Sequence, residues 1–257
     1  MSPSPVEWLG RLVGGRPKQA DADRPVRRRK HPDPTLPESD LRATWQLVSL
    51  LLQYPDEKLF ELMPSIRSAA DTLPTEIGAP LLRLISYLEQ GDKQALRSLY
   101  VDTFDTTRKC ALHLTYYAFG DTRKRGIALV QFKQAYRKAG LEVGDQELPD
   151  HLSVVLEFGA TGDVPVAWKL LNDNRAGIEL LQLGLEAKDS PWADAVTALR
   201  ATLPPLDGTQ SEAVARLLAE GPPNEDVGLE AYSIDPLLNP HPDDDLALSF
   251  DQLGASR

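Results

Sequence analysis

Residues 100–160 read YVDTFDTTRKCALHLTYYAFGDTRKRGIALVQFKQAYRKAGLEVGDQELPDHLSVVLEFGA and contain the most informative pattern of the chain. Leu129, Phe132 and Tyr136 recur at three- and four-residue spacing, as on one face of a helix, and Gly140 then ends that helix. Two polar blocks, GDTRKRG (120–126) and ELPDH (147–151), interrupt the helical pattern and are too unusual for core packing alone. The stretch therefore indicates a binding protein built from helices.

The same helical periodicity continues on both sides of this stretch. Strand signals are nearly missing, because no run of β-branched residues alternates with polar ones between turn residues. Helices are expected at about 41–52, 55–69, 80–90, 92–104, 109–119 and 123–139, from Pro149 onwards, over 163–185 and 190–203, and after a capping box at 209–212. The sequence predicts an all-α, single multi-helix domain.

Composition divides the chain into three parts. Residues 1–37 contain seven prolines and a basic cluster, and we expect a disordered basic tail there. Residues 221–257 are acidic and rich in proline, and we expect a second disordered tail. The helical domain should therefore occupy residues 38–220.

Charge and cysteine content limit the partners and the compartment. The net charge of −10 disfavours nucleic acid and anionic membranes. A lone cysteine, Cys110, excludes an intrachain disulfide and suits a reducing compartment. No apolar run approaches the roughly 18 residues that a membrane-spanning helix needs. We expect a cytoplasmic protein without direct membrane insertion.

Residues suited to catalysis or metal binding are sparse. Cys110 and His113 have the spacing of a ligand pair, but a structural zinc site needs four ligands and the chain has only 4 histidines. Asp102 and Asp105 could pair as acid and base, but Arg108 follows at the same spacing and offers a simple ion pair. We therefore expect no catalytic residue, no metal site and no enzymatic activity.

The two polar blocks are the candidate binding features. GDTRKRG places three cations in the first turn of a helix, where the helix dipole disfavours them. They either pair locally with Glu142, Asp145 or Glu147, or form a patch that faces a partner. In ELPDH, we expect Pro149 to start a helix with Asp150 in its first turn. Asp150 and His151 would then form a rim suited to the arginines of a docking peptide.

Four blocks together resemble a known family: YPDE (54–57), YVDTFD (100–105), LTYYAFGDTRKRGIAL (114–129) and ELPDHLSVVLEF (147–158). They are similar to the respiratory nitrate reductase molybdenum-cofactor assembly chaperones, the delta-subunit or NarJ-type members of the redox-enzyme maturation proteins. The resemblance covers about residues 40–200. The chain departs from the family pattern at His113, where aromatic residues are typical, and at Ser153, where proline often follows the motif.

The resemblance implies an all-helical maturation fold without catalysis. It implies binding in the cytoplasm to the N-terminal segment of the apo catalytic (alpha) subunit of nitrate reductase, and help with molybdenum-cofactor insertion before membrane docking. The molybdenum cofactor would be handled only through the client and not bound stably, and molybdenum-cofactor biosynthesis proteins would be further partners. The client-binding residues carried over are Asp150, His151 and Glu147, and, from the second motif, Tyr116, Tyr117, Asp121 and Arg123.

Two alternatives stay open. The chain could be a permanent structural subunit of a respiratory complex, which would copurify with the mature enzyme. It could also be a chaperone for a different molybdoenzyme.

Overall fold

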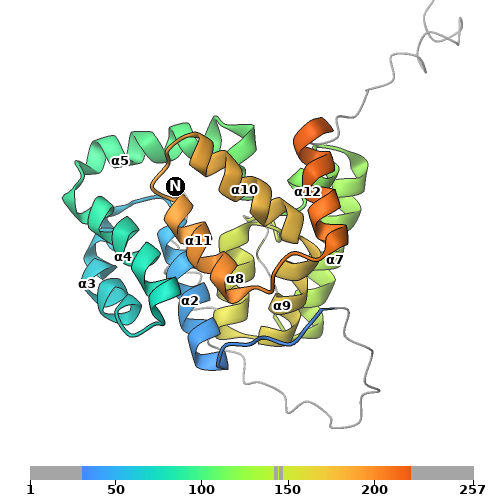
Figure 1. The fold of residues 1–257 in the computed structure, drawn as a ribbon, viewed down its shortest axis with the longest axis horizontal. Helices are drawn as coiled ribbons and strands as arrows, with labels where there is room; N and C mark the ends of the chain where they lie inside the picture. The colour runs from blue at the N-terminus through green and yellow to red at the C-terminus, as the bar shows by residue number, and fades with distance from the viewer. Residues whose placement is uncertain (1–30, 142–143, 145–146, 221–257) are drawn as a thin grey trace, which may run out of the picture. The chain divides into compact units, whose positions relative to one another are not determined.

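The computed structural model describes residues 31–141, 144 and 147–220. In these ranges the chain folds into packed helices without a β-strand, which confirms the all-α prediction (Figure 1). The α-helices are α2 (Glu38–Leu51), α3 (Glu57–Ala70), α4 (Thr75–Gln90), α5 (Lys93–Tyr100), α6 (Tyr116–Phe119), α7 (Arg123–Lys138), α8 (Leu152–Thr161), α9 (Val164–Asp173), α10 (Arg175–Ala187), α11 (Ala193–Thr202) and α12 (Gly208–Glu220). A π-helical turn, η1 (Val101–Asp105), and a 3-10 turn, η2 (Arg108–Cys110), lie between α5 and α6.

Helix α2 runs through the core against α8 and α11. Its residues Trp45 and Val48 are fully buried, as their helical spacing predicts. Gly159 of α8 allows the close approach of the two helices, because a Cβ at this position would lie 2.5 Å from the Trp45 ring. The Trp45 indole Nε1 donates to Thr202 Oγ1 of α11 at 3.1 Å. One tryptophan thus fixes α8 and α11 against α2.

Aspartate side chains begin several helices by accepting a backbone N–H. Asp92 and Asp163 cap α5 and α9, as expected from the sequence. The capping box of α12 lies earlier than predicted, because Asp207 Oδ1 accepts from Gln210 N at 2.7 Å and Gln210 Oε1 accepts from Asp207 N at 3.1 Å. The reciprocal pair is formed by Asp207 and Gln210, and not by Thr209 and Glu212.

Helix α4 begins at Thr75, five residues before the predicted start at Pro80. A proline inside a helix removes one backbone hydrogen bond and commonly destabilises it by about 3 kcal/mol. The added turn buries Ile77, which is 1% exposed, and brings Gly78 against the last turn of α3. Tertiary packing therefore outweighs the local preference of proline for a helix start.

The helix predicted over 163–185 is divided into α9 and α10 at Asn174. Leu170 O, near the end of α9, accepts from the Asn174 side-chain amide at 2.8 Å as well as from the Asn174 backbone N at 3.2 Å. Asparagine competes in this way with the backbone bonds that would continue a helix. The apolar spacing alone did not reveal the break.

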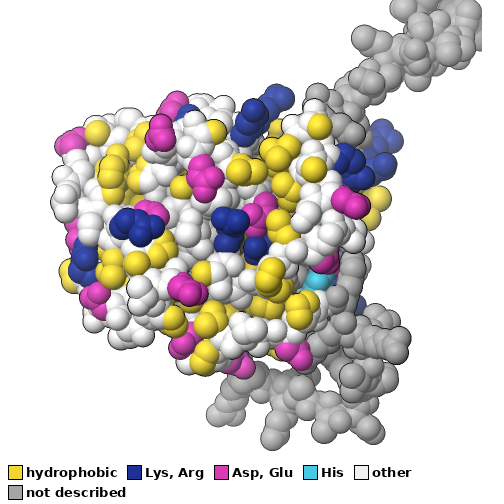
Figure 2. Space-filling model, in the orientation of Figure 1, with side chains coloured by type: hydrophobic (Ala, Val, Ile, Leu, Met, Phe, Trp, Pro, Cys, Tyr) yellow, Lys and Arg dark blue, Asp and Glu magenta, His cyan; other side chains and the backbone are white. Residues whose placement is uncertain are grey.

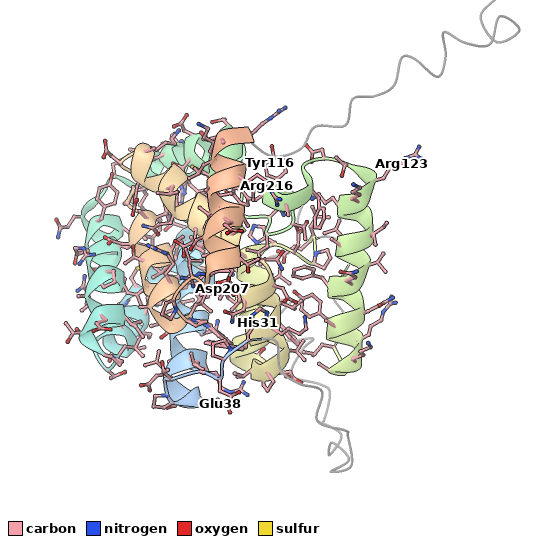
Figure 3. The ribbon with its side chains drawn as sticks, turned by 45° about the vertical axis from the view of Figure 1, so that its right-hand side comes forward. His31, Glu38, Tyr116, Arg123, Asp207 and Arg216 are labelled. Carbon is pink, nitrogen blue, oxygen red and sulfur yellow. The ribbon has the colours of Figure 1, made fainter. Side chains whose placement is uncertain are left out.

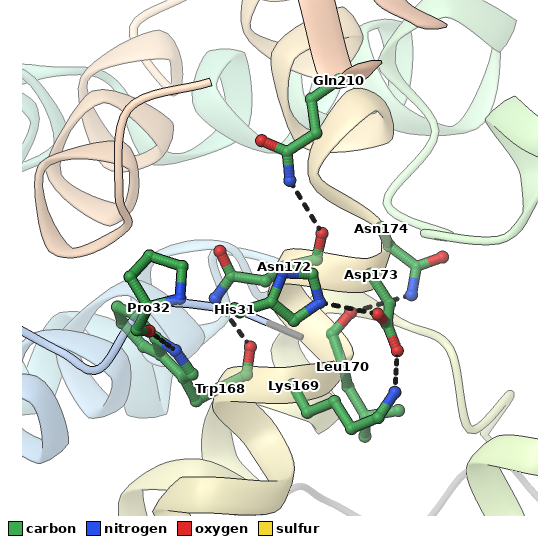
Figure 4. A network of polar contacts seen from close by, with 9 residues as sticks. All are labelled: His31, Pro32, Trp168, Lys169, Leu170, Asn172, Asp173, Asn174 and Gln210. Carbon is green, nitrogen blue, oxygen red and sulfur yellow. Dashed lines mark hydrogen bonds and ion pairs between the residues drawn. The ribbon is translucent and has the colours of Figure 1, made fainter. Parts of the chain in front are cut away.

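His31 and Pro32, which we expected in the N-terminal tail, lie against α9. His31 Nε2 is 2.7 Å from Asp173 Oδ1, and Trp168 Nε1 donates to Pro32 O at 3.0 Å (Figure 4). Gln210 of α12 donates to Asn172 O at 3.4 Å on the same helix. Helix α9 therefore joins the start and the end of the described chain.

The π-helical turn η1 replaces the last turn of the helix predicted over 92–104. Lys188 Nζ donates to Asp102 Oδ2 at 2.9 Å and to Thr107 Oγ1 at 2.9 Å, and so ties this turn to the end of α10. The partner of Asp102 is therefore Lys188, and the ion pair expected with Arg108 is wrong.

Candidate functional site

The segment around His113 pairs with the segment around His151 instead of forming the helix predicted over 109–119. Leu114 N donates to Asp150 O at 3.0 Å, and Leu152 N donates to Leu112 O at 2.7 Å. The two histidines form an isolated antiparallel bridge. Since backbone groups are satisfied by a partner distant in the sequence, this stretch stays extended. The pairing brings two candidate motifs together.

Asp150 lies beneath this pairing and is fully buried. Thr115 donates to its Oδ2 twice, from the backbone N at 3.1 Å and from Oγ1 at 2.5 Å. His113 Nδ1 lies 3.5 Å from Oδ1, and Arg125 Nη2 lies 3.9 Å from Oδ2. Burial alone would raise the pKa of Asp150, but these partners outweigh burial and hold the pKa below its usual range.

This position corrects the expected placement of Asp150. The carboxylate lies two residues before α8 and not in the first turn of a helix, and it does not reach the surface as a rim. Its acceptor sites face Thr115, His113 and Arg125. Asp150 therefore joins the 111–115 segment, the start of α7 and the start of α8.

His151 occupies the N-cap position of α8, and its ring packs edge-on against His113 with 5.3 Å between the ring centroids. Burial, with a smaller contribution from the neighbouring His113, lowers the pKa of His151 to about 4. The imidazole is therefore neutral at neutral pH. Within the described ranges, the His151 ring nitrogens make no hydrogen bond to protein.

Arg125, one of the three cations of GDTRKRG at the start of α7, is compensated by nearby acidic groups. Its Nη1 lies 2.8 Å from Asp121 Oδ1, its guanidinium lies over the Tyr116 ring at 5.8 Å, and Asp150 is its second acidic neighbour. For Arg125 the compensation is local, but it comes from Asp121 and Asp150. Of the partners expected from the sequence, Glu142 and Asp145 lie outside the described residues.

The two tyrosines of the second motif are buried. The Tyr117 hydroxyl contacts Lys109 O and Ala111 O, both at 3.0 Å, and burial raises its pKa well above the usual value. Gly120 follows with φ of +56°, a left-handed conformation that favours glycine and turns the chain into α7. Tyr116 and Tyr117 therefore hold the shape of this region.

The other candidate residues are exposed. Asp121, Arg123 and Glu147 have solvent-exposed side chains. Figure 3 shows Arg123 at the start of α7, directed away from the helices, and Tyr116 on α6. Exposed apolar side chains lie close to these candidate residues in the sequence: Ile127 (64% exposed) and Val130 (52%) on α7, and Leu148 (42%) beside Glu147. The structure thus separates the seven predicted residues into a buried layer and an exposed layer, with His151 between them.

The matching family model is the nitrate reductase delta subunit, over residues 70–198. The chain belongs to this family. A Bacillus subtilis member, described as a probable nitrate reductase molybdenum cofactor assembly chaperone (NarJ), is 31% identical over 64% of this chain and 90% of its own length. The nitrate reductase-like protein NarX of Mycobacterium tuberculosis is 35% identical over 61% of this chain, and the match spans only 24% of that longer protein.

A solved structure resembles this delta-subunit family chain as well. The crystal structure of an Archaeoglobus fulgidus protein described as a redox enzyme maturation protein has a TM-score of 0.49 and 27% sequence identity. The similarity covers 68% of this chain and 98% of that one.

Sequence reasoning did not connect three residues with Asp150: His113, Thr115 and Arg125. It weighed Arg125 only as one of three cations and His113 as a metal ligand beside Cys110 or a departure from the family pattern; Cys110 is a buried free thiol. The described residues contain no cluster of three or more potential metal ligands, and none of their helices is long and apolar enough to cross a membrane. The departure from the family pattern at His113 was the one sequence signal that pointed to this contact.

Proposed function

We propose that this delta-subunit family member is a chaperone that binds the N-terminal segment of the apo catalytic subunit of nitrate reductase. It assists insertion of the molybdenum cofactor in the cytoplasm, before the client docks at the membrane. Family membership and the description of the Bacillus subtilis relative support this proposal. The cofactor is cargo that reaches the client, with biosynthesis proteins as the donors, and the chaperone does not retain it.

The observation that carries the proposal is the buried Asp150 carboxylate together with the exposed side chains on the segments that it connects. Asp150 fixes three separate segments that bear exposed polar and apolar side chains. Exposed apolar residues rimmed by polar ones are typical of surfaces that bind polypeptides. Figure 2 shows basic and acidic side chains interspersed over the face in view, so this face carries no single strong field.

We assign different roles to the seven predicted residues. Glu147, Asp121 and Arg123 contact the client directly, because their side chains are exposed. His151 offers the client a neutral imidazole. The buried residues Asp150, Tyr116 and Tyr117 position the others. A partly apolar surface with exposed carboxylates at Glu147 and Asp121 can accept an amphipathic segment that has basic side chains.

The proposal is tested by titrating the full chain with a synthetic peptide of the cognate catalytic subunit's N-terminus. We expect a Kd in the micromolar range or below, and a loss of at least about fivefold in affinity for His151→Ala with an unchanged circular dichroism spectrum. The exposed control Glu61→Gln, on α3, should bind as the unmodified chain does. No binding by the unmodified chain would reject the proposal.

Copurification separates the two remaining alternatives. A chaperone should be recovered with the cofactor-free catalytic subunit and not with the mature enzyme. A permanent structural subunit would copurify in equal amounts with the mature complex. A chaperone for another molybdoenzyme would bind that enzyme's N-terminal peptide and leave the nitrate reductase peptide unbound.

A further inference from the structure

Glu157 differs from the other buried acidic residues. Asp150, Glu157 and Glu179 are each at most 5% exposed. Asp150 contacts His113 and Arg125, and Glu179 pairs with Arg175 and Arg200, each at 2.7 Å. Asp150 Oδ1 and Glu157 Oε1 both lack a hydrogen bond, but Asp150 Oδ1 lies 3.5 Å from His113 Nδ1, whereas Glu157 has no basic partner among the described residues. Buried carboxylates are rarely left in this state.

A second unpaired polar atom lies on the same face of α8. Ser153 precedes Glu157 by four residues, so the two side chains are neighbours on the helix surface. Ser153 is 5% exposed, and its Oγ has no hydrogen-bond partner. A carboxylate oxygen and a hydroxyl, both buried and unpaired at one place, indicate a ligand that donates hydrogen bonds.

A third group, Glu147, adds negative charge. Pro149, two residues after Glu147, accepts at its carbonyl from the Tyr136 hydroxyl near the start of α8, and Leu141 lies against Gly162 at the end of α8. Burial, with a smaller contribution from the negative charge of Glu147, raises the pKa of Glu157 to about 7. The two carboxylates therefore lie close enough to repel each other, and a cation would relieve that repulsion.

We propose that Glu157, Ser153 and Glu147 form a subsite for one basic side chain, a guanidinium or ammonium group, of the client polypeptide. The inference rests on the proposed function and adds a specific contact to it. A cation with several N–H donors can pair with both carboxylates and donate to the Ser153 hydroxyl, which satisfies every unpaired atom at this place. The absence of a three-ligand cluster among the described residues favours an organic cation over a metal ion.

The experiment is a double-mutant cycle between the chaperone and the peptide. The full chain and its Glu157→Gln variant are titrated with the client's N-terminal peptide and with a set in which each Lys or Arg is replaced singly by Gln. We expect that one of these replacements, at the Lys or Arg that occupies the subsite, weakens binding of the peptide to the unmodified chain by about tenfold. The same replacement should have little effect on Glu157→Gln, because the partner is already lost.

Two controls make the result specific. Glu61→Gln removes one negative charge from an exposed position and should leave the whole peptide series unchanged. Ser153→Ala keeps both carboxylates and should weaken the parent peptide by a smaller factor than Glu157→Gln. If the parent peptide binds Glu157→Gln as tightly as the unmodified chain, the subsite is wrong while the proposed function stands. If the peptide binds neither the unmodified chain nor any of its variants, both proposals fail.

Discussion

The start and the middle of α8 place two buried carboxylates in opposite situations. At the start, Asp150 receives hydrogen bonds from Thr115 and lies beside His113 and Arg125. In the middle, Glu157 has no basic neighbour in the described ranges, although each of the two carboxylates has one oxygen without a hydrogen bond. Burial raises the pKa of both carboxyl groups. At Asp150 the partners outweigh burial and leave the pKa lowered, whereas at Glu157 the pKa is raised to about 7.

Asp150 stabilises the fold, whereas Glu157 is placed to bind the basic side chain of the client. The partners of Asp150 come from the 111–115 segment and from α7, so the carboxylate joins parts of the chain that are distant in sequence. The Glu157 carboxylate does not connect separate segments of the described chain, and burying it without a basic partner opposes folding. Proteins keep such unfavourable groups where function requires them.

The largest effect should follow the removal of the Asp150 carboxylate. Asp150→Ala leaves the Thr115 donors unpaired and Arg125 without its buried acidic neighbour, and we expect unfolding free energy to fall by about 3 kcal/mol. Urea unfolding monitored by circular dichroism measures this change. Asp150→Asn, which keeps the shape and one acceptor, should lose less than Asp150→Ala. Equal stability of Asp150→Ala and the unmodified chain would show that the carboxylate does not brace the fold.

A smaller effect of opposite sign is expected at Glu157. Its folded-state pKa of about 7 lies above the ordinary value of 4.5, so the folded state holds this proton more tightly than the unfolded state. Its contribution to stability is therefore greatest below pH 4.5 and falls as the pH rises to about 7.

Glu157→Gln should consequently be more stable than the unmodified chain at pH 8, on the order of 2 kcal/mol, and the difference should vanish near pH 4.5. Urea unfolding at the two pH values measures it, with Glu61→Gln as the exposed control. A stability difference that does not change with pH would contradict the raised pKa of Glu157.

Sequence reasoning succeeded where the cause of structure is local. The spacing of Trp45 and Val48 predicts a helix face, and Asp92 and Asp163 begin helices through contacts three residues away. Helix termini were less predictable, because the break at Asn174 depends on one side-chain bond that competes with the helix.

The candidate site could be located from the sequence but not built from it. Its motifs marked Asp150 and His151, yet the residues that hold Asp150 approach it through pairing between segments about 35 positions apart, which no local pattern encodes. A signal for Glu157 did exist in the sequence. It is the lone charged residue in the apolar stretch LSVVLEF (152–158), in a helix that is buried along most of its length.

The smallest effect is expected at Asp121, the exposed partner of Arg125. Asp121 has a side chain 72% exposed, and exposed ion pairs contribute little, so Asp121→Asn should lower the unfolding free energy by no more than about 0.5 kcal/mol. Arg125 retains the buried Asp150 carboxylate at 3.9 Å, which limits the loss. Urea unfolding at low and high salt measures the change, and the small difference should shrink further at high salt, because salt screens exposed charges. A loss at Asp121 as large as that at Asp150 would show that the surface pair, and not the buried carboxylate, holds the start of α7.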